Sequence, residues 1–206
     1  AFLDEVFKSS SSILNSILTI INERLFHNGR EVAPVPLLTL FGASNELPED
    51  DELVALYDRF LLRFMVDYIQ EDFRFLHMLQ AQEPAERTTL SLAELRQLQT
   101  NVRAVTVSGT ILGVMADIRS ELRSKDILAS DRRYRQSIGL MQALACLDGR
   151  SAVSESDLIF LEHILWKEPS EPVIAWTKTL VSLCTSTLMT APPPLSAPRP
   201  SGPHPR

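Results

Sequence analysis

The sequence has few glycines and lacks the glycine-rich loop that cradles phosphates in many nucleotide-binding proteins. It contains 7 glycines among 206 residues, and none belongs to a GxxxxGK[ST] array. In such a loop, consecutive backbone N–H groups and a lysine hold the β- and γ-phosphates. These 206 residues therefore provide no phosphate cradle of this type.

Cysteine and histidine are also sparse. Cys146 and Cys184 lie in apolar helical contexts, with no CxxC spacing and no histidine nearby. This pattern is typical of reduced, buried thiols in a cytoplasmic protein and argues against a disulfide framework. The histidines are scattered and form no metal-ligand spacing; they are His27, His77, His163 and His204.

Neither an excess of positive charge nor a long apolar run is present. The net charge of -6 gives no reason to expect nucleic acid or an anionic membrane surface as a partner. The longest uncharged run, residues 179–198, is interrupted by Ser, Thr and Pro, so direct membrane insertion is not expected. From Ala191 onward Pro, Ser and Ala dominate, and residues 191–206 are expected to form a disordered tail.

An acidic pair near the start of the chain is the first positive signal. The apolar residues Ala1, Phe2 and Leu3 lead directly into Asp4 and Glu5. In nucleotide-hydrolysing proteins, such a pair at a strand end binds Mg²⁺ together with a nucleoside triphosphate. Because a strand usually has about five or six residues, we expect the chain to be the carboxyl-terminal part of a larger protein. The alternative interpretation is a solvated acidic turn.

The first part of the chain mixes helix and strand patterns. Apolar residues at helical spacing predict a helix over about residues 11–24, and Asn28-Gly29 predicts a hairpin with positive φ at both turn positions. The apolar run 37–43 predicts a strand buried on both faces of a parallel sheet, ending just before Asn45. The remaining expected elements are a helix from the acidic residues 49–52 through Tyr57, a strand or helix end at 60–66, and a helix over 71–82.

Beyond a polar stretch at residues 83–89, which is the predicted domain boundary, the pattern is helical throughout. Helices are expected over residues 91–99, 107–124, 130–147, 154–166 and 173–188, with Leu112 and Ile138 among the inward-facing residues. The predicted fold is a partial α/β core, with parallel strands and a hairpin insert, followed by an all-α lid. Its domains are residues 1–83 (core), 84–168 (lid), 169–190 (additional helix) and 191–206 (tail).

An ordered set of motifs resembles the MoxR-type AAA+ ATPases, particularly the RavA branch. The resemblance covers about residues 1–168, and the ordered set is far more specific than any single motif. The motifs are Phe2-Leu3-Asp4-Glu5-Val6-Phe7-Lys8, Ile13-Leu14-Asn15-Ser16-Ile17-Leu18, Ile21-Asn22-Glu23-Arg24-Leu25-Phe26, Ala43-Ser44-Asn45-Glu46-Leu47-Pro48, Leu56-Tyr57-Asp58-Arg59-Phe60-Leu61-Leu62-Arg63, Ser130-Asp131-Arg132-Arg133-Tyr134, and Gly149-Arg150-Ser151-Ala152-Val153 followed by Asp157-Leu158.

The resemblance implies a role for each residue at the ends of the apolar elements. Asp4 would hold Mg²⁺ and Glu5 would polarise the attacking water, as the Walker B element. Asn45 would act as sensor I, an amide that orients this water, although a Ser-Asn pair after a strand is often only turn chemistry.

Two arginines complete the implied site, and each has a neighbour that competes for the role. Arg59 would be the arginine finger that reaches the γ-phosphate of an adjacent subunit, with Arg63 as the alternative. Arg132 would be sensor II in the lid, with Arg133 as the alternative.

For the whole protein, the resemblance implies ATP hydrolysis with Mg²⁺ in a ring, expected to be a homohexamer, and chaperone-like remodelling of partner proteins. It also implies association with a von Willebrand factor A-domain protein. The hairpin around residues 26–32 resembles the insert that this branch carries, although an ordinary surface hairpin would give the same pattern. Because the Walker A loop is absent, two other hypotheses stay open: a non-catalytic protein-interaction module and a truncated gene product.

Overall fold

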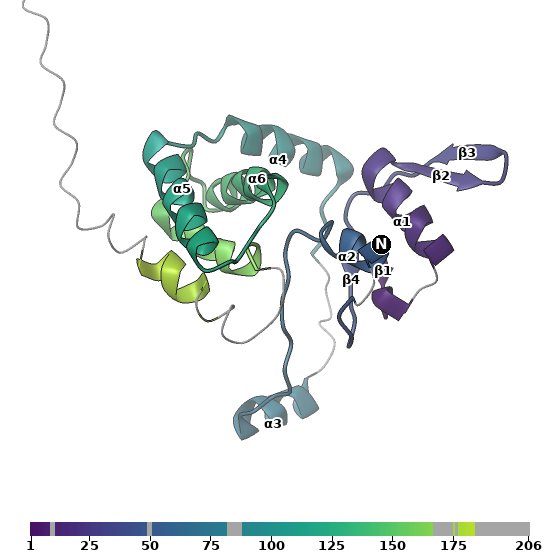
Figure 1. Ribbon diagram of the computed structural model, residues 1–206, viewed down its shortest axis with the longest axis horizontal. Helices are drawn as coiled ribbons and strands as arrows, with labels where there is room; N and C mark the ends of the chain where they lie inside the picture. Colours follow the sequence, from purple (N-terminus) through teal and green to yellow (C-terminus); the bar gives the residue numbers. More distant parts are fainter. Residues whose placement is uncertain (9–10, 49–50, 82–87, 167–174, 176, 184–206) are drawn as a thin grey trace, which may run out of the picture. The chain divides into compact units, whose positions relative to one another are not determined.

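The computed structural model describes residues 1–8, 11–48, 51–81, 88–166, 175 and 177–183. The chain forms two compact units, Ala1–Glu86 and Arg87–Arg206 (Figure 1), here called the N-terminal unit and the helical unit. The N-terminal unit contains parallel and antiparallel strand pairs as well as helices, and the second unit is helical. This confirms the predicted fold class. The predicted tail and Cys184 lie outside the described residues.

A short parallel strand pair lies at the centre of the N-terminal unit. Strand β1 (Phe2–Leu3) pairs with β4 (Phe41–Gly42), so that Phe2 lies opposite Phe41 and Leu3 opposite Gly42. The pairing continues past both strands, because the Val6 N–H donates to the Ala43 carbonyl at 3.0 Å. The residues that follow β1 and β4 therefore leave the pair at the same edge.

The strand predicted over residues 37–43 is shorter and more exposed than expected. Only Phe41 and Gly42 are in a strand, and the side chains of Leu38 and Phe41 are 64% and 61% exposed. Burial on both faces requires cover on both faces, and among the described strands β4 has β1 as its one partner. The apolar composition correctly predicted a parallel strand, but the predicted burial on both faces was wrong.

One small core holds two of the helices of this unit against the strand pair. Helix α1 (Ser11–Glu23), as predicted, contributes Leu14; the short 3-10 turn η1 (Val6–Lys8) contributes Val6; and α2 (Asp51–Tyr57) contributes Leu56. All three side chains are buried. Apolar residues at helical spacing on α1 pack around them, namely Ile17, Leu18 and Ile21.

The predicted hairpin is confirmed, but its turn lies one residue later than expected. Strands β2 (Leu25–Asn28) and β3 (Glu31–Pro34) are antiparallel, and Asn28 pairs with Glu31, so the loop residues are Gly29 and Arg30. Gly29 has a φ of 63°. A two-residue loop with glycine and positive φ at its first position matches a type II′ turn, whereas the prediction assumed type I′. The hairpin extends beyond the end of α1 (Figure 1).

Residues 60–71 form neither a strand nor a helix, so both interpretations of residues 60–66 were wrong. This apolar segment has no described strand to pair with, and Phe64, Met65 and Val66 are all more than half exposed. The following helix, α3 (Asp72–Gln80), was predicted, but it has no buried residue and lies apart from α1 and α2 within this unit (Figure 1).

The helical unit has a helical element at each position that the sequence predicted. These elements are α4 (Leu92–Ala104), α5 (Gly109–Ser124), α6 (Asp131–Leu147), η2 (Glu155–His163) and a helical stretch at residues 177–183. Helix α4 extends five residues beyond its predicted end at residue 99. Ser91 and Glu94 form a capping box at the start of α4, and the Ser108 hydroxyl accepts a hydrogen bond from the Ile111 N–H at the start of α5.

The core of this unit lies between α5, α6 and η2. Its members on α5 and α6 are buried at helical spacing and include Ile111, Met115, Ile118, Leu122, Met141 and Ala145. Two predicted inward residues differ: Leu112 is 46% exposed, and Ile138 is only partly buried. Leu112 follows the buried Ile111 directly, and one helix position turns the side chain by about 100°.

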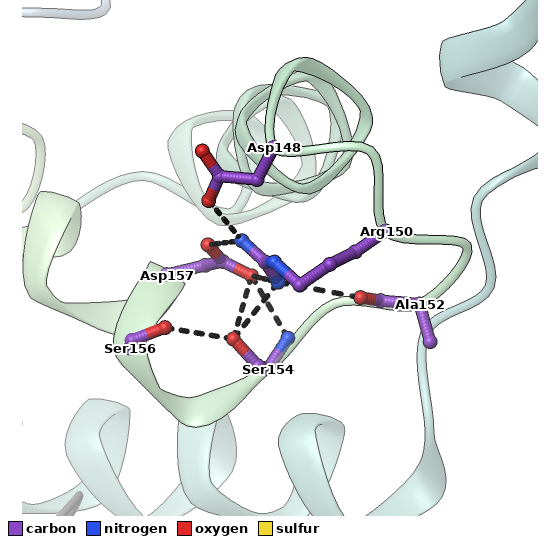
Figure 2. A network of polar contacts seen from close by, with 6 residues as sticks. All are labelled: Asp148, Arg150, Ala152, Ser154, Ser156 and Asp157. Atoms are coloured by element: carbon purple, nitrogen blue, oxygen red, sulfur yellow. Dashed lines mark hydrogen bonds and ion pairs between the residues drawn. The ribbon is translucent and has the colours of Figure 1, made fainter.

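The element predicted as a helix over residues 154–166 is a 3-10 helix rather than an α-helix. It opens at the predicted capping box of Ser154 and Asp157. The Arg150 guanidinium reaches into this box and binds Asp157 through both oxygens, at 2.7 and 2.8 Å (Figure 2). It also donates to Asp148 at 2.8 Å. A bidentate pair of this kind fixes the loop between α6 and η2.

Candidate functional site

The parallel pairing of β1 with β4 brings three of the predicted site residues to one edge. Asp4 and Glu5 follow β1, and Asn45 follows β4 by three residues. All three side chains are exposed. We call this group the strand edge.

Glu5 adopts a backbone conformation that is unusual for its residue type. Its φ is 48°, in the left-handed region, and its N–H donates to the Asp4 carboxylate at 3.0 Å. Non-glycine residues in this region cost roughly 1–3 kcal/mol and persist where surrounding contacts fix them, often at functional sites. The bend turns the chain from β1 into η1 and leaves the Glu5 side chain at the strand edge.

Lys8 connects the two sides of the strand edge. Its ammonium group lies 3.2 Å from a Glu5 carboxylate oxygen and 3.5 Å from a Glu46 carboxylate oxygen. The hydrogen bond that Lys8 donates to Glu5, followed by the charge of Glu46, raises the pKa of Lys8 above its ordinary value. The side chains of all three residues are about half exposed, so each ion pair is screened by water.

The loop that carries Asn45 is closed by its neighbours. The Ser44 hydroxyl donates to the Glu46 carbonyl at 2.9 Å and accepts from the Glu46 N–H at 3.2 Å. This is the local turn chemistry expected of serine after a strand. It holds the backbone around Asn45 and leaves the Asn45 side chain exposed at the strand edge.

The structure does not bring Arg59 to the strand edge of its own chain. The Arg59 Nε donates to the Asn22 side-chain oxygen at 3.1 Å, at the end of α1. Arg59 also lines a cavity of about 160 Å³ with residues that precede β4, whereas Asn45 follows it; these lining residues are Leu37, Leu38 and Leu40. Arg59 is thus held near the opposite end of β4 from Asn45.

Arg63, the alternative to Arg59, is a buried residue engaged within its own unit. Its guanidinium donates to the Tyr57 carbonyl at 3.0 Å, stacks 3.8 Å above the Tyr57 ring and lies 3.8 Å from the Asp58 carboxylate. Burial lowers the pKa of Arg63 below its ordinary value. Reaching a ligand on another chain would require Arg63 to leave these contacts.

The two adjacent arginines at the start of α6 differ in the same way. Arg133 is buried, and its Nε donates to the Ile164 carbonyl at 2.7 Å, which joins α6 to the end of η2. Arg132 is exposed. Of the two, Arg132 is the one that a ligand can reach without disturbing the core of the helical unit.

Metal binding at the strand edge would have to use few protein ligands. Within the described residues, no three His, Cys, Asp or Glu side chains gather as a metal site. Mg²⁺ is commonly held by one or two carboxylates together with substrate phosphates and water. An exposed Asp4 fits such a site. None of the described helices is long and apolar enough to cross a membrane.

Sequence reasoning missed the contacts made by Lys8 and Asn22. Lys8 lies three residues after Glu5, a spacing at which opposite charges can meet, so the Glu5 contact could have been found. The contacts of Lys8 with Glu46 and of Asn22 with Arg59 span 38 and 37 positions in the sequence, and no local pattern predicts them.

Two family matches cover most of the chain. Residues 1–103 match the family described as the MoxR domain in the MoxR-vWA-beta-propeller ternary systems. Residues 110–174 match the family described as the AAA lid domain. The first match includes the whole strand edge, and the second includes Arg132 and the Arg150–Asp157 pair.

Similar proteins agree with these matches. The chain is 44% identical over 175 residues to the uncharacterized protein MJ0079 of Methanocaldococcus jannaschii, covering 84% of this chain and 46% of that protein. It is 43% identical over 172 residues to MJ0812 of the same organism, covering 83% and 46%. The chain thus spans about half the length of these relatives.

A solved structure shares the fold. The crystal structure of a candidate ATPase from Cytophaga hutchinsonii superposes with a TM-score of 0.67, at 16% identity, over 90% of this chain and 64% of that one.

Proposed function

The chain belongs to the MoxR family of AAA ATPases, and from this membership we propose that its N-terminal unit supplies the groups that act on the terminal phosphate of ATP. The observation that carries the proposal is the parallel pairing of β1 with β4, which sets Asp4, Glu5 and Asn45 at one edge. Hydrolysis needs a metal ligand, a group that polarises water and a group that orients it.

Each residue of the strand edge takes one of these roles. Asp4 holds Mg²⁺, which supplies charge neutralisation when it is bound with ATP. The Glu5 carboxylate accepts a proton from the attacking water, and the Asn45 amide orients that water. The exposure of all three side chains supports roles toward a ligand rather than within the fold.

Arg59 acts on the strand edge of a neighbouring subunit. Its position near the opposite end of β4 supports this role, because Arg59 is far along the strand from Asn45 of its own chain. The buried contacts of Arg63 favour Arg59 over Arg63 as the finger. In the same way, the buried bond of Arg133 favours the exposed Arg132 as sensor II.

For the whole protein, we propose a homohexameric cytoplasmic ring that couples ATP hydrolysis to chaperone-like remodelling of partners. The family that residues 1–103 match is described as part of MoxR-vWA-beta-propeller systems, which supports a von Willebrand factor A-domain partner. The narrower resemblance to the RavA branch stays a prediction, as does the division into a core at residues 1–83 and a lid at residues 84–168.

A chimaera tests the catalytic assignment. In the chimaera, this chain would replace the matching segment of MJ0079. MJ0079 as a whole is more than twice as long as that segment. We expect the chimaera to hydrolyse ATP, and Glu5→Gln to lower kcat by about 10²- to 10⁴-fold while nucleotide binding is retained, because the metal ligand Asp4 is intact. Steady-state phosphate release and equilibrium nucleotide binding are the measurements.

The matched control is Glu31→Gln on the hairpin, which removes one exposed carboxylate away from the strand edge and should leave kcat unchanged. Normal turnover in the Glu5→Gln chimaera would remove Glu5 from its role. If MJ0079 hydrolyses ATP and the unmutated chimaera neither binds nor hydrolyses it, the chain is better described as a non-catalytic interaction module.

A further inference from the structure

The strand edge has one side after β1 and one side after β4. In the described structure, Lys8 is the one residue whose side chain forms ion pairs with both sides. It contacts Glu5 on the β1 side at 3.2 Å and Glu46 on the β4 side at 3.5 Å. From these contacts, we propose that Lys8 is a positioning residue for hydrolysis, which holds the Glu5 carboxylate toward the Asn45 loop. This inference rests on the proposed role of Glu5.

Lys8 restricts the direction of the Glu5 side chain, which the backbone does not fix. The backbone fixes where Glu5 and Glu46 lie, through the strand pairing and the closed turn at Ser44. It does not fix the direction of the Glu5 side chain, which is about half exposed and has several rotatable bonds. A lysine three residues later, within the short turn η1, restricts that direction from one side.

Glu46 makes the restriction specific to the strand edge. With Glu5 as its one partner, the flexible lysine stem could swing with the carboxylate into solvent. The second carboxylate, next to Asn45, anchors the ammonium group on the β4 side. Consistent with this, the Glu5 hydrogen bond and then the Glu46 charge both raise the pKa of Lys8. Because the two carboxylates share one ammonium group, either can release it without leaving Lys8 unpaired.

The first test uses the chain itself and needs no catalysis. In ¹H–¹⁵N spectra, Lys8→Met should shift the backbone amide signals of Asn45 and Glu46, because the tether to their loop is lost. Lys8→Arg, which keeps the charge, should shift them less. Lys178→Met is the control, since it removes an exposed lysine of the helical unit. Unchanged Asn45 and Glu46 signals in Lys8→Met would show that the bridge does not form, and would overturn the inference.

The second test measures kcat and KM in the MJ0079 chimaera. Lys8→Met should lower kcat by about two- to fivefold with KM nearly unchanged, a range typical of exposed ion pairs. Lys8→Arg should restore most of the loss. Exchanging the charges, with Lys8→Glu and Glu46→Lys together, should recover more activity than Lys8→Glu alone, because a cation again lies between the carboxylates.

The outcomes separate this inference from the proposed function. If Glu5→Gln abolishes hydrolysis but Lys8→Met leaves kcat unchanged, Glu5 is the base and Lys8 does not position it. If Glu5→Gln has no effect, the proposed function fails while the spectra of the isolated chain still report whether the bridge forms. A rise in KM with unchanged kcat would place Lys8 in nucleotide binding and overturn the positioning role.

Discussion

The two units of the chain differ in how they use their apolar residues. Of the nineteen buried hydrophobic residues in the described structure, Val6, Leu14 and Leu56 belong to the N-terminal unit, and the others belong to the helical unit. The N-terminal unit instead exposes a run of large apolar side chains that includes Phe64, Met65, Val66 and Tyr68. The helical unit thus has a complete core of its own, whereas the strand edge is carried by a unit with a small one.

The difference extends to charged groups. In the helical unit, Arg133 and Arg150 lie in contacts that hold the fold, with Ile164, Asp157 and Asp148. At the strand edge, Asp4, Glu5 and Asn45 are exposed, and the ion pairs of Lys8 are screened. Exposed, weakly held polar groups suit ligand binding, since a ligand can replace their contacts at little cost.

The largest expected effect compares one buried leucine from each core. Leu122→Ala in the helical unit should lower the free energy of unfolding by about 3 kcal/mol, because Leu122 is fully buried among well-packed neighbours. Leu14→Ala should cost less, because most of the residues around Leu14 are only partly buried and can close over the gap. Denaturant unfolding, followed by probes in each unit, measures both.

Leu112→Ala is the control for this pair, since Leu112 is 46% exposed and on the same helix as Leu122. Its effect should be below about 1 kcal/mol. Equal losses for Leu122→Ala and Leu14→Ala would break the comparison between the two units.

A smaller effect concerns the buried carboxylate of the helical unit. Burial alone would raise the pKa of Asp157, but hydrogen bonds from Arg150 and Ser154 outweigh it, and the pKa lies below the ordinary 3.8. The stabilisation is therefore present above pH 3.8 and is lost as the pH falls through the folded-state pKa. Asp157→Asn should cost about 2 kcal/mol at pH 7 and remove this acid dependence.

Thermal unfolding of the helical unit between pH 7 and pH 2 measures this dependence. The control is Asp148→Asn, which also loses a bond to Arg150 but from a side chain that is 67% exposed. It should have a smaller effect at every pH. An acid-induced loss that persists in Asp157→Asn would assign the dependence to other groups.

The smallest effects have opposite signs in the two units. Gly29→Ala in the hairpin should destabilise by about 1 kcal/mol, because its φ of 63° disfavours any side chain. Gly139→Ala in α6 should stabilise by about 0.5–1 kcal/mol, since a Cβ there meets nothing within 4 Å and a helix interior favours alanine. Differential scanning calorimetry resolves the sign of each change, and a matching sign would contradict the assigned conformations.

The features that the sequence predicted correctly are mostly those that depend on contacts between residues close together in the chain. The helix starts near residues 91, 107 and 154, the helix over residues 11–24 and the hairpin follow from contacts within a few residues. All are present, with the hairpin turn one residue later than predicted. The acidic pair and Asn45 were each correctly expected to follow a strand, and the structure pairs these two strands directly and in parallel.

What the sequence did not determine depends on partners distant in the chain. The segment 60–66 has strand composition but is not a strand in the described structure. Which of Arg59 and Arg63 is the less buried depends on their contacts with Asn22 and Tyr57, which form only in the folded unit. The element after Ser154 is 3-10 rather than α-helical, a distinction that apolar periodicity is too coarse to make over nine residues.

The neighbouring arginines at the start of α6 have a mechanical consequence. The bond from Arg133 to the Ile164 carbonyl fastens the first turn of α6 to the end of η2, and both elements are packed in the core. Arg132, the exposed residue next to Arg133, therefore stands on a helix start that is tied to η2, so that a displacement of this helix start is passed to η2 as well as along α6.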